Sequence, residues 1–133
     1  MLLDKSISQL LEGYKKGEFT PVDVVCECFE RIEKFDTKIN SFITILNKKE
    51  VLEKANVTDL SLPLSGIPFV LKDAYITKGI RTTSASKVLG NFIPQYSATV
   101  YKKLIDAGAI LIGKINMDSW GHGGSSENTD FGP

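Results

Sequence analysis

The chain has 133 residues, of which 42% are hydrophobic and 24% are charged. This length and composition predict a globular protein with one core and exclude a disordered tail. The 16 basic residues equal the 16 acidic ones in number, so no overall positive field would attract nucleic acid or an anionic membrane. Apolar runs fall short of the ~18 residues that a membrane span needs, and Met1–Asp4 lacks a signal-peptide pattern. We therefore expect a cytoplasmic protein without a membrane contact.

The sequence offers little for a metal site. Cys26 and Cys28 lie two positions apart in a predicted helix, so their side chains point to different faces. We expect two reduced, partly buried thiols. His122 is the single histidine, and without clustered cysteines no zinc site is expected.

Helical patterns dominate the start of the chain. Apolar residues at helical spacing predict a helix over residues 6–16, with Gly17 as its stop. Thr20-Pro21-Val22-Asp23 is a helix-start signal, because a threonine cap, a proline and an acidic residue follow one another in the first turn. The second helix should end near Asp36.

Shorter elements follow this helix. Residues 40–46 are predicted as a strand and residues 48–55 as a short helix with an exposed charged face. A polar connector occupies residues 56–63. We therefore divide the chain into an N-terminal helical segment, residues 1–60, and an α/β part, residues 61–133.

A short apolar run over residues 67–71 predicts a buried strand, and Lys72 stands at its carboxyl end. Ligands bind at this edge of open α/β sheets. A lysine that acts as a base near neutral pH needs its pKa lowered from ~10.4 to about 7 to 8 by burial or by its neighbours. Val70 and Leu71 would supply the burial. Asp73 would oppose it if its carboxylate pointed inward, and we expect that carboxylate to point away.

A second buried strand is predicted over residues 109–113. Between the two strands, Ser97 should cap a helix that Gly108 closes. A strand, a helix and a strand in succession predict a parallel βαβ unit. The unit would place Lys72 and Asn116 at the same edge of the sheet.

The tail, residues 116–133, is rich in glycine and hydroxyl side chains, which let backbone amides approach a ligand closely. It stops at Gly132-Pro133, a turn signal. Because a parallel strand pair needs cover on both faces and neighbours at both edges, we expect a chain that is truncated at its carboxyl end.

Several segments, taken together and in this order, resemble the amidase signature family, and within it the A subunits of glutamyl-tRNA(Gln)/aspartyl-tRNA(Asn) amidotransferases. The likeness runs over essentially the whole chain. The segments are Pro63–Pro68, Lys72-Asp73, Thr82–Lys87, Gly113–Asp118, Gly123–Asn128 and Phe131-Gly132-Pro133. The resemblance implies the N-terminal part of an α/β/α fold, in which helices precede a mixed or parallel sheet with a βαβ unit. Residues 61–133 would then be the first part of the catalytic core.

In that family a Ser-cisSer-Lys triad hydrolyses amides. The resemblance implies that Lys72 is the base, which draws a proton from the nucleophilic serine through a second serine with a cis peptide bond. Both serines would lie beyond Pro133, so Ser125 and Ser126 are not expected to be these residues, and the chain alone should be inactive. A loop matched by five residues lines the family's substrate pocket: Gly121, His122, Gly123, Gly124 and Ser125.

The resemblance also implies partners. The complete protein would hydrolyse glutamine and pass ammonia to the B subunit of an amidotransferase, which uses ATP and Mg²⁺ and holds the misacylated tRNA; the C subunit would complete the complex. This segment itself would bind no cofactor. Two alternatives stay open: a stand-alone amidase of other small amides, and a noncatalytic binding module that folds as a stable monomer.

Overall fold

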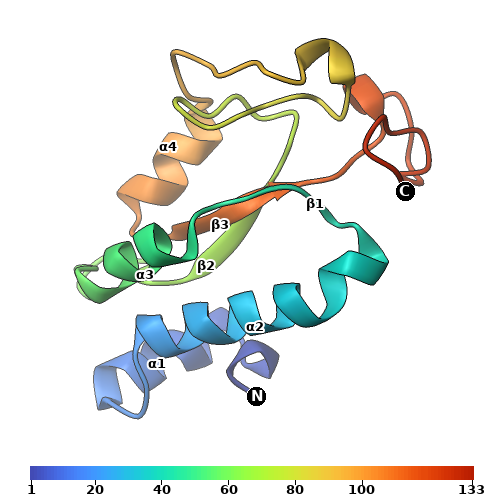
Figure 1. Ribbon diagram of the computed structural model, residues 1–133. Helices are drawn as coiled ribbons and strands as arrows, with labels where there is room; N and C mark the ends of the chain where they lie inside the picture. Colours follow the sequence, from blue (N-terminus) through green and yellow to red (C-terminus); the bar gives the residue numbers. More distant parts are fainter.

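The computed structural model describes all 133 residues and contains four α-helices and one three-stranded sheet. The strands β1 (Phe42–Ile45), β2 (Pro68–Lys72) and β3 (Ile110–Ile115) lie in the order β1-β3-β2. β2 pairs parallel to β3, and β1 pairs antiparallel to β3 on its other side. The predicted α/β class and the parallel pair joined by a crossover are thus confirmed, and the sheet is mixed (Figure 1).

The first two helices form where the sequence predicts them. They are α1 (Ile7–Lys16) and α2 (Pro21–Ile39). At the start of α2, the Thr20 side chain accepts a hydrogen bond from the backbone N–H of Asp23, and the Asp23 carboxylate accepts one from the backbone N–H of Thr20. The helix runs beyond the expected end and stops where Asn40 adopts a left-handed backbone with φ of 54°.

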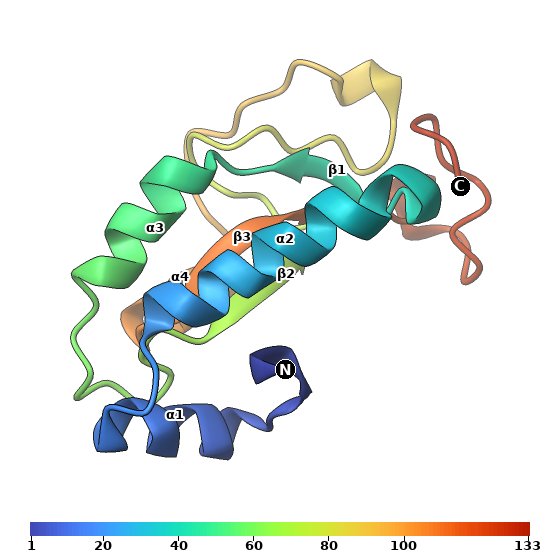
Figure 2. The ribbon, with the colours of Figure 1, turned by 60° about the horizontal axis from the view of Figure 1, so that its bottom comes forward.

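The remaining helices are α3 (Lys48–Asn56) and α4 (Thr99–Asp106). α2 crosses one face of the sheet, whereas α4 lies on the other (Figures 1 and 2). The prediction that Ser97 caps α4 is wrong: the N-cap is Ala98, with no side-chain bond. The hydroxyl of Ser97 instead accepts a hydrogen bond from the backbone N–H of Lys78, which ties the long β2–α4 connection to the start of the helix. None of the four helices is both long and apolar enough to cross a bilayer.

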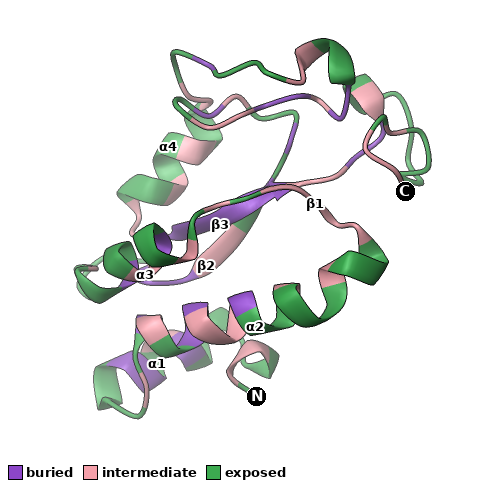
Figure 3. Cartoon of the chain, in the orientation of Figure 1, coloured by how far each residue is buried: buried purple, intermediate pink, exposed green.

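Two apolar clusters hold the helices on the sheet, and β3, the central strand, is buried along nearly all of its length (Figure 3). The first cluster joins α2 and α3 to β3 and consists of Val25, Phe29, Val51, Ala55, Ile110 and Ile112. The second joins α1 and α2 to the residue before β2 and consists of Leu10, Tyr14, Val24 and Ile67. The N-terminal helices therefore pack directly on the strands that lead to Lys72.

The entry to β2 is a close contact between backbone and helix. Gly66 has φ of +69°, and a Cβ atom there would lie 2.5 Å from Cγ of Pro21 at the start of α2. The hydroxyl of Tyr14 in α1 donates a hydrogen bond to the carbonyl oxygen of Gly66 at 3.2 Å. A side chain at this position would both strain the backbone and separate α2 from the sheet.

Candidate functional site

Lys72 is the last residue of β2, opposite Ile115 at the end of β3. The backbone N–H of Asp73 donates to the carbonyl oxygen of Ile115 at 3.1 Å and extends the parallel pairing by one residue. Asn116 follows directly on β3. The two strands therefore bring Lys72 and Asn116 to the same edge, as the sequence predicted (Figure 1).

Asn116 ties the end of the chain to this edge. Its side-chain amide donates to the carbonyl oxygen of Gly132 at 2.8 Å, and its side-chain oxygen accepts from the hydroxyl of Thr129, also at 2.8 Å. The carboxyl-terminal residues consequently turn back toward the strand ends, where the C-terminus lies in Figure 1.

The side chain of Lys72 is exposed in this chain. Val70, on the same face of β2, is 43% exposed, whereas Leu71, on the other face, is only 5% exposed. The burial of Lys72 that the sequence led us to expect is therefore not found within these 133 residues. Strand alternation explains the difference, because Leu71 packs into the interior and leaves Lys72 on the open face.

Asp73 points into the interior, so the prediction that it points away is wrong. Its side chain is completely buried, and its Oδ1 lies 3.2 Å from Nζ of Lys114, which is also completely buried. Lys114 donates two hydrogen bonds of 2.9 Å, to the carbonyl oxygen of Tyr75 and to Oγ1 of Thr82. Burial lowers the pKa of the Lys114 ammonium group, and the charge of Asp73 opposes this shift.

Sequence reasoning missed Lys114, although a signal was present. A single charged residue within the otherwise apolar run Ile110–Ile115 can be buried only with a partner, and Asp73 is an acid directly after the neighbouring predicted strand. The register places Lys114 opposite Leu71, two residues before Asp73. The sequence favours Lys72 for the functional role, but the lysine that the structure buries is Lys114.

The hydroxyl-rich segment after β2 is fixed by Asp73, through both its carboxylate and its backbone carbonyl group. The backbone N–H of Thr83 donates to Oδ2 of Asp73 at 2.7 Å, and that of Ser84 donates to the carbonyl oxygen of Asp73 at 3.2 Å. Ser84 and Ala85 both adopt left-handed backbone conformations, with φ of 51° and 56°. Two consecutive non-glycine residues in this region require surrounding contacts to hold them, and Asp73 provides one.

A second buried carboxylate, Asp118, organises the glycine-rich loop. The backbone N–H groups of Ser126 and Asn128 donate to its two oxygens at 2.9 and 3.0 Å. These bonds hold the pKa of the Asp118 carboxyl below its ordinary value, and the positive charge of Lys72 adds a smaller contribution.

The residues predicted to line a substrate pocket all belong to this loop and are exposed: Gly121, His122, Gly123, Gly124 and Ser125. The loop begins at a short 3-10 helix, Ser119–Gly121. Within this chain all five residues remain open to solvent. Hydrogen bonds from Ser119 and Trp120 to residues 84 and 85, and from Ser84 to Asp73, connect the start of the loop to the residue after Lys72.

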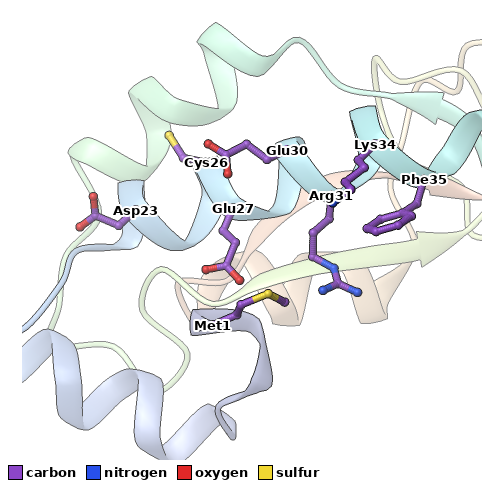
Figure 4. A pocket seen from close by; sticks show the side chains of 8 residues that line it. All are labelled: Met1, Asp23, Cys26, Glu27, Glu30, Arg31, Lys34 and Phe35. Carbon is purple, nitrogen blue, oxygen red and sulfur yellow. The ribbon is translucent and has the colours of Figure 1, made fainter.

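A groove of about 600 Å³ lies elsewhere, on the outward side of α2 (Figure 4). Its lining residues are Met1, Asp23, Cys26, Glu27, Glu30, Arg31, Lys34 and Phe35. Glu27 accepts a hydrogen bond from the backbone N–H of Leu2 at 2.9 Å, which docks the N-terminus beside the groove. None of these residues comes from the strand ends, so the groove is separate from the Lys72 region.

No three His, Cys, Asp or Glu side chains of the chain are grouped so that they could hold a metal ion. Cys26 and Cys28 are both free thiols of intermediate exposure.

Comparison with known proteins gives consistent relatives. Residues 23–133 match the protein-family model described as Amidase. The chain is 42% identical to the A subunit of the glutamyl-tRNA(Gln) amidotransferase of Geobacter metallireducens, over 99% of this chain and 28% of that protein. It is 45% identical to the protein of the same name from Prochlorococcus marinus, over 96% of this chain and 28% of that protein. The chain thus spans 28% of the length of these curated relatives.

Solved structures show the same fold. The A subunit of the glutamyl-tRNA(Gln) amidotransferase from Thermotoga maritima superimposes with a TM-score of 0.83 and 29% identity, over 100% of this chain and 27% of that one. The peptide amidase from Stenotrophomonas maltophilia superimposes with a TM-score of 0.79 and 25% identity, over 87% of this chain and 25% of that one.

Proposed function

Because the chain belongs to the amidase family, we propose that the complete protein is the glutamine-hydrolysing A subunit of a glutamyl-tRNA(Gln) amidotransferase. The observation that carries this proposal is the match to A subunits over 96–99% of the chain at 42–45% identity. The position of Lys72 at the carboxyl end of β2, the edge at which ligands bind in open α/β sheets, supports it.

In this proposal Lys72 is the base of a Ser-cisSer-Lys triad whose two serines are supplied from outside these 133 residues. The nucleophilic hydroxyl attacks the carbonyl carbon of the glutamine side-chain amide, and its proton passes through the cis serine to the amine of Lys72. Return of the proton to the leaving nitrogen releases ammonia, and water then hydrolyses the acyl-enzyme to glutamate. The chain alone supplies a base without a nucleophile, so we expect it to be inactive.

The complex would divide the work between its members. The B subunit would use ATP and Mg²⁺, hold the misacylated tRNA and receive the ammonia, and the C subunit would complete the assembly in the cytoplasm. The even balance of 16 basic and 16 acidic residues supports this division, because a segment that binds tRNA directly would be expected to carry excess positive charge.

We further propose that residues 61–133 form the first part of the catalytic core and that residues 1–60, a mainly helical segment that also supplies the edge strand β1, pack against it. The cluster shared by α2, α3 and β3 supports this arrangement, since it joins the two segments through buried apolar side chains.

Reconstitution tests the proposed function. The complete protein should co-purify with the B and C subunits when the three are co-expressed, and the complex should release glutamate from glutamine and convert Glu-tRNA(Gln) to Gln-tRNA(Gln). A complex that forms but releases no glutamate would contradict the glutaminase assignment. A protein that associates with neither partner would contradict its place in an amidotransferase.

A stand-alone amidase is the second candidate, favoured by the likeness to the Stenotrophomonas peptide amidase. The two candidates predict different substrates. Hydrolysis of peptide or aryl amides at a higher kcat/KM than glutamine, by the protein without any partner, would support the stand-alone enzyme.

A further inference from the structure

We propose that Asp118 is a positioning residue that fixes the loop of residues 121–128 relative to Lys72 and so sets how tightly glutamine binds. This inference deepens the proposed function and rests on it, because it takes Lys72 as the base and the loop as part of the substrate pocket.

The Asp118 side chain is the point to which the loop is anchored. It is 4% exposed, and each of its oxygens accepts one backbone N–H, from Ser126 at 2.9 Å and from Asn128 at 3.0 Å. The carbonyl oxygen of Asn128 in turn accepts the backbone N–H of Ser119 at 2.7 Å, which closes the base of the loop. Charged acceptors give stronger hydrogen bonds than neutral ones, so this carboxylate holds the two loop amides more strongly than a neutral side chain would.

The loop also packs directly on the carboxylate. A Cβ atom on Gly123 would lie 2.5 Å from Cγ of Asp118 and 2.7 Å from its Oδ2. Only a residue without a side chain permits this approach, so the path of the loop depends on both Gly123 and Asp118. Loop and carboxylate form one closely packed unit.

This unit is joined to the end of β2 by hydrogen bonds. The hydroxyl of Ser119 donates to the carbonyl oxygen of Ala85 at 2.8 Å. The backbone N–H of Trp120 donates to the carbonyl oxygen of Ser84 at 3.0 Å. Ser84 in turn donates to the carbonyl oxygen of Asp73, the residue after Lys72. A continuous set of bonds therefore runs from the residue beside Lys72 to the base of the loop.

Asp130 offers a matched comparison. It accepts the backbone N–H of Lys87 at 2.8 Å and the hydroxyl of Ser86 at 3.1 Å, so it too is a carboxylate that anchors a connecting segment. Its bonds reach residues 86 and 87, outside the loop of residues 121–128. If KM depended only on how firmly the connecting segments are held, removing either carboxylate charge would change it. If KM depends on the loop of residues 121–128, only removal of the Asp118 charge should change it.

The test compares steady-state glutamine hydrolysis by the complete amidotransferase and its Asp118→Asn and Asp130→Asn variants. The Asp118→Asn substitution keeps the size of the side chain but replaces one acceptor oxygen with an NH2 group, a donor that would face a backbone N–H. We expect KM for glutamine to rise about tenfold or more in Asp118→Asn, with kcat within about threefold. A displaced loop would weaken the binding of the substrate and of the transition state to the same extent, which raises KM and leaves kcat nearly unchanged. In Asp130→Asn both constants should stay within about twofold.

Gly123→Ala is a second route to the same displacement, and it applies if Asp118→Asn does not fold. Its Cβ would push the loop from the carboxylate while Asp118 stays intact, and KM should rise to a similar extent. An unchanged KM in the folded variants overturns the inference whatever their kcat, and so does an equal rise of KM in Asp130→Asn.

A Lys72→Met variant separates this inference from the proposed function. If Lys72→Met keeps full activity, the role of Lys72 as the base is wrong. If Lys72→Met is inactive while KM in Asp118→Asn is normal, only the inference about Asp118 is wrong.

Discussion

Asp73 and Lys114 form an ion pair of 3.2 Å at the ends of adjacent parallel strands, with both side chains completely buried. Lys114 reaches the carbonyl oxygen of Tyr75 and the hydroxyl of Thr82, and Asp73 accepts the backbone N–H of Thr83. These bonds replace part of the water that the two charges lose on burial, and Oδ1 of Asp73 keeps only the ion pair with Lys114. The pair therefore fixes the connection after β2 to the end of β3, directly beside Lys72.

Removing the cation should be costly. Lys114→Met leaves the charge of Asp73 buried without a partner, and we expect the free energy of unfolding to fall by roughly 3 to 5 kcal/mol. Urea unfolding of the complete protein measures this, with Lys102→Met in α4 as the exposed control. Adding Asp73→Asn to Lys114→Met should recover part of the loss, because no charge then remains buried. Equal midpoints for Lys114→Met and Lys102→Met would contradict the importance of the pair.

Two glycines with nearly the same positive φ should respond differently to alanine. Gly66 has φ of +69° with Pro21 in the way of a Cβ, whereas Gly17 has φ of +68° with open space around it. Gly17→Ala should cost about 1 kcal/mol for the left-handed conformation alone. Gly66→Ala should cost roughly 2 to 4 kcal/mol because overpacking adds to that strain. Thermal unfolding of the two variants compares them, and equal losses would show that α2 yields freely at this contact.

Acid should release the loop before the core. Backbone N–H donors hold the pKa of Asp118 and of Asp130 below the ordinary value. A carboxyl group with a lowered pKa in the folded state stabilises that state fully above its unfolded pKa of ~3.9, and the contribution disappears as pH falls through the lower folded value. Hydrogen exchange of residues 121–130, corrected for intrinsic rates, should therefore lose protection below about pH 4 while residues 110–115 stay protected.

The matched variant for the acid experiment is Asp118→Asn, in which the amides of Ser126 and Asn128 should show little protection at any pH. Protection of these two amides that persists unchanged to about pH 2 in the unmodified protein would mean that the charge of Asp118 does not hold the loop.

The parts of this structure that sequence predicted are those that local chemistry determines. Thr20 and Asp23 cap α2 with their own neighbours, so the start of this helix can be identified from four consecutive residues. The run that became most of β3, Ile110–Gly113, is apolar whichever strand it pairs with. The order of strand, helix and strand was sufficient to place Lys72 and Asn116 at one edge.

The parts that sequence did not predict depend on distant partners. Ser97 has the chemistry of a helix cap, yet its hydroxyl bonds to Lys78. Asp73 turns inward because Lys114, on another strand, is there to neutralise it. In the sequence, Asp118 had no role beyond membership of the segment Gly113–Asp118. Its role follows from the structure, in which two backbone N–H groups of the loop donate hydrogen bonds to its oxygens. Predicting such contacts requires the register of the strands in the sheet, which the spacing of apolar residues in the sequence does not specify.

The most direct test of the account is the activity of Lys72→Met in the complete amidotransferase, with Lys78→Met as a control for loss of a nearby exposed lysine. Loss of the base of a cooperating triad should lower kcat for glutamine hydrolysis by about a thousandfold or more, with glutamine still bound. Lys78→Met should hydrolyse glutamine at the unmodified rate. Turnover by Lys72→Met close to that of the unmodified enzyme would contradict the assignment of Lys72 as the base.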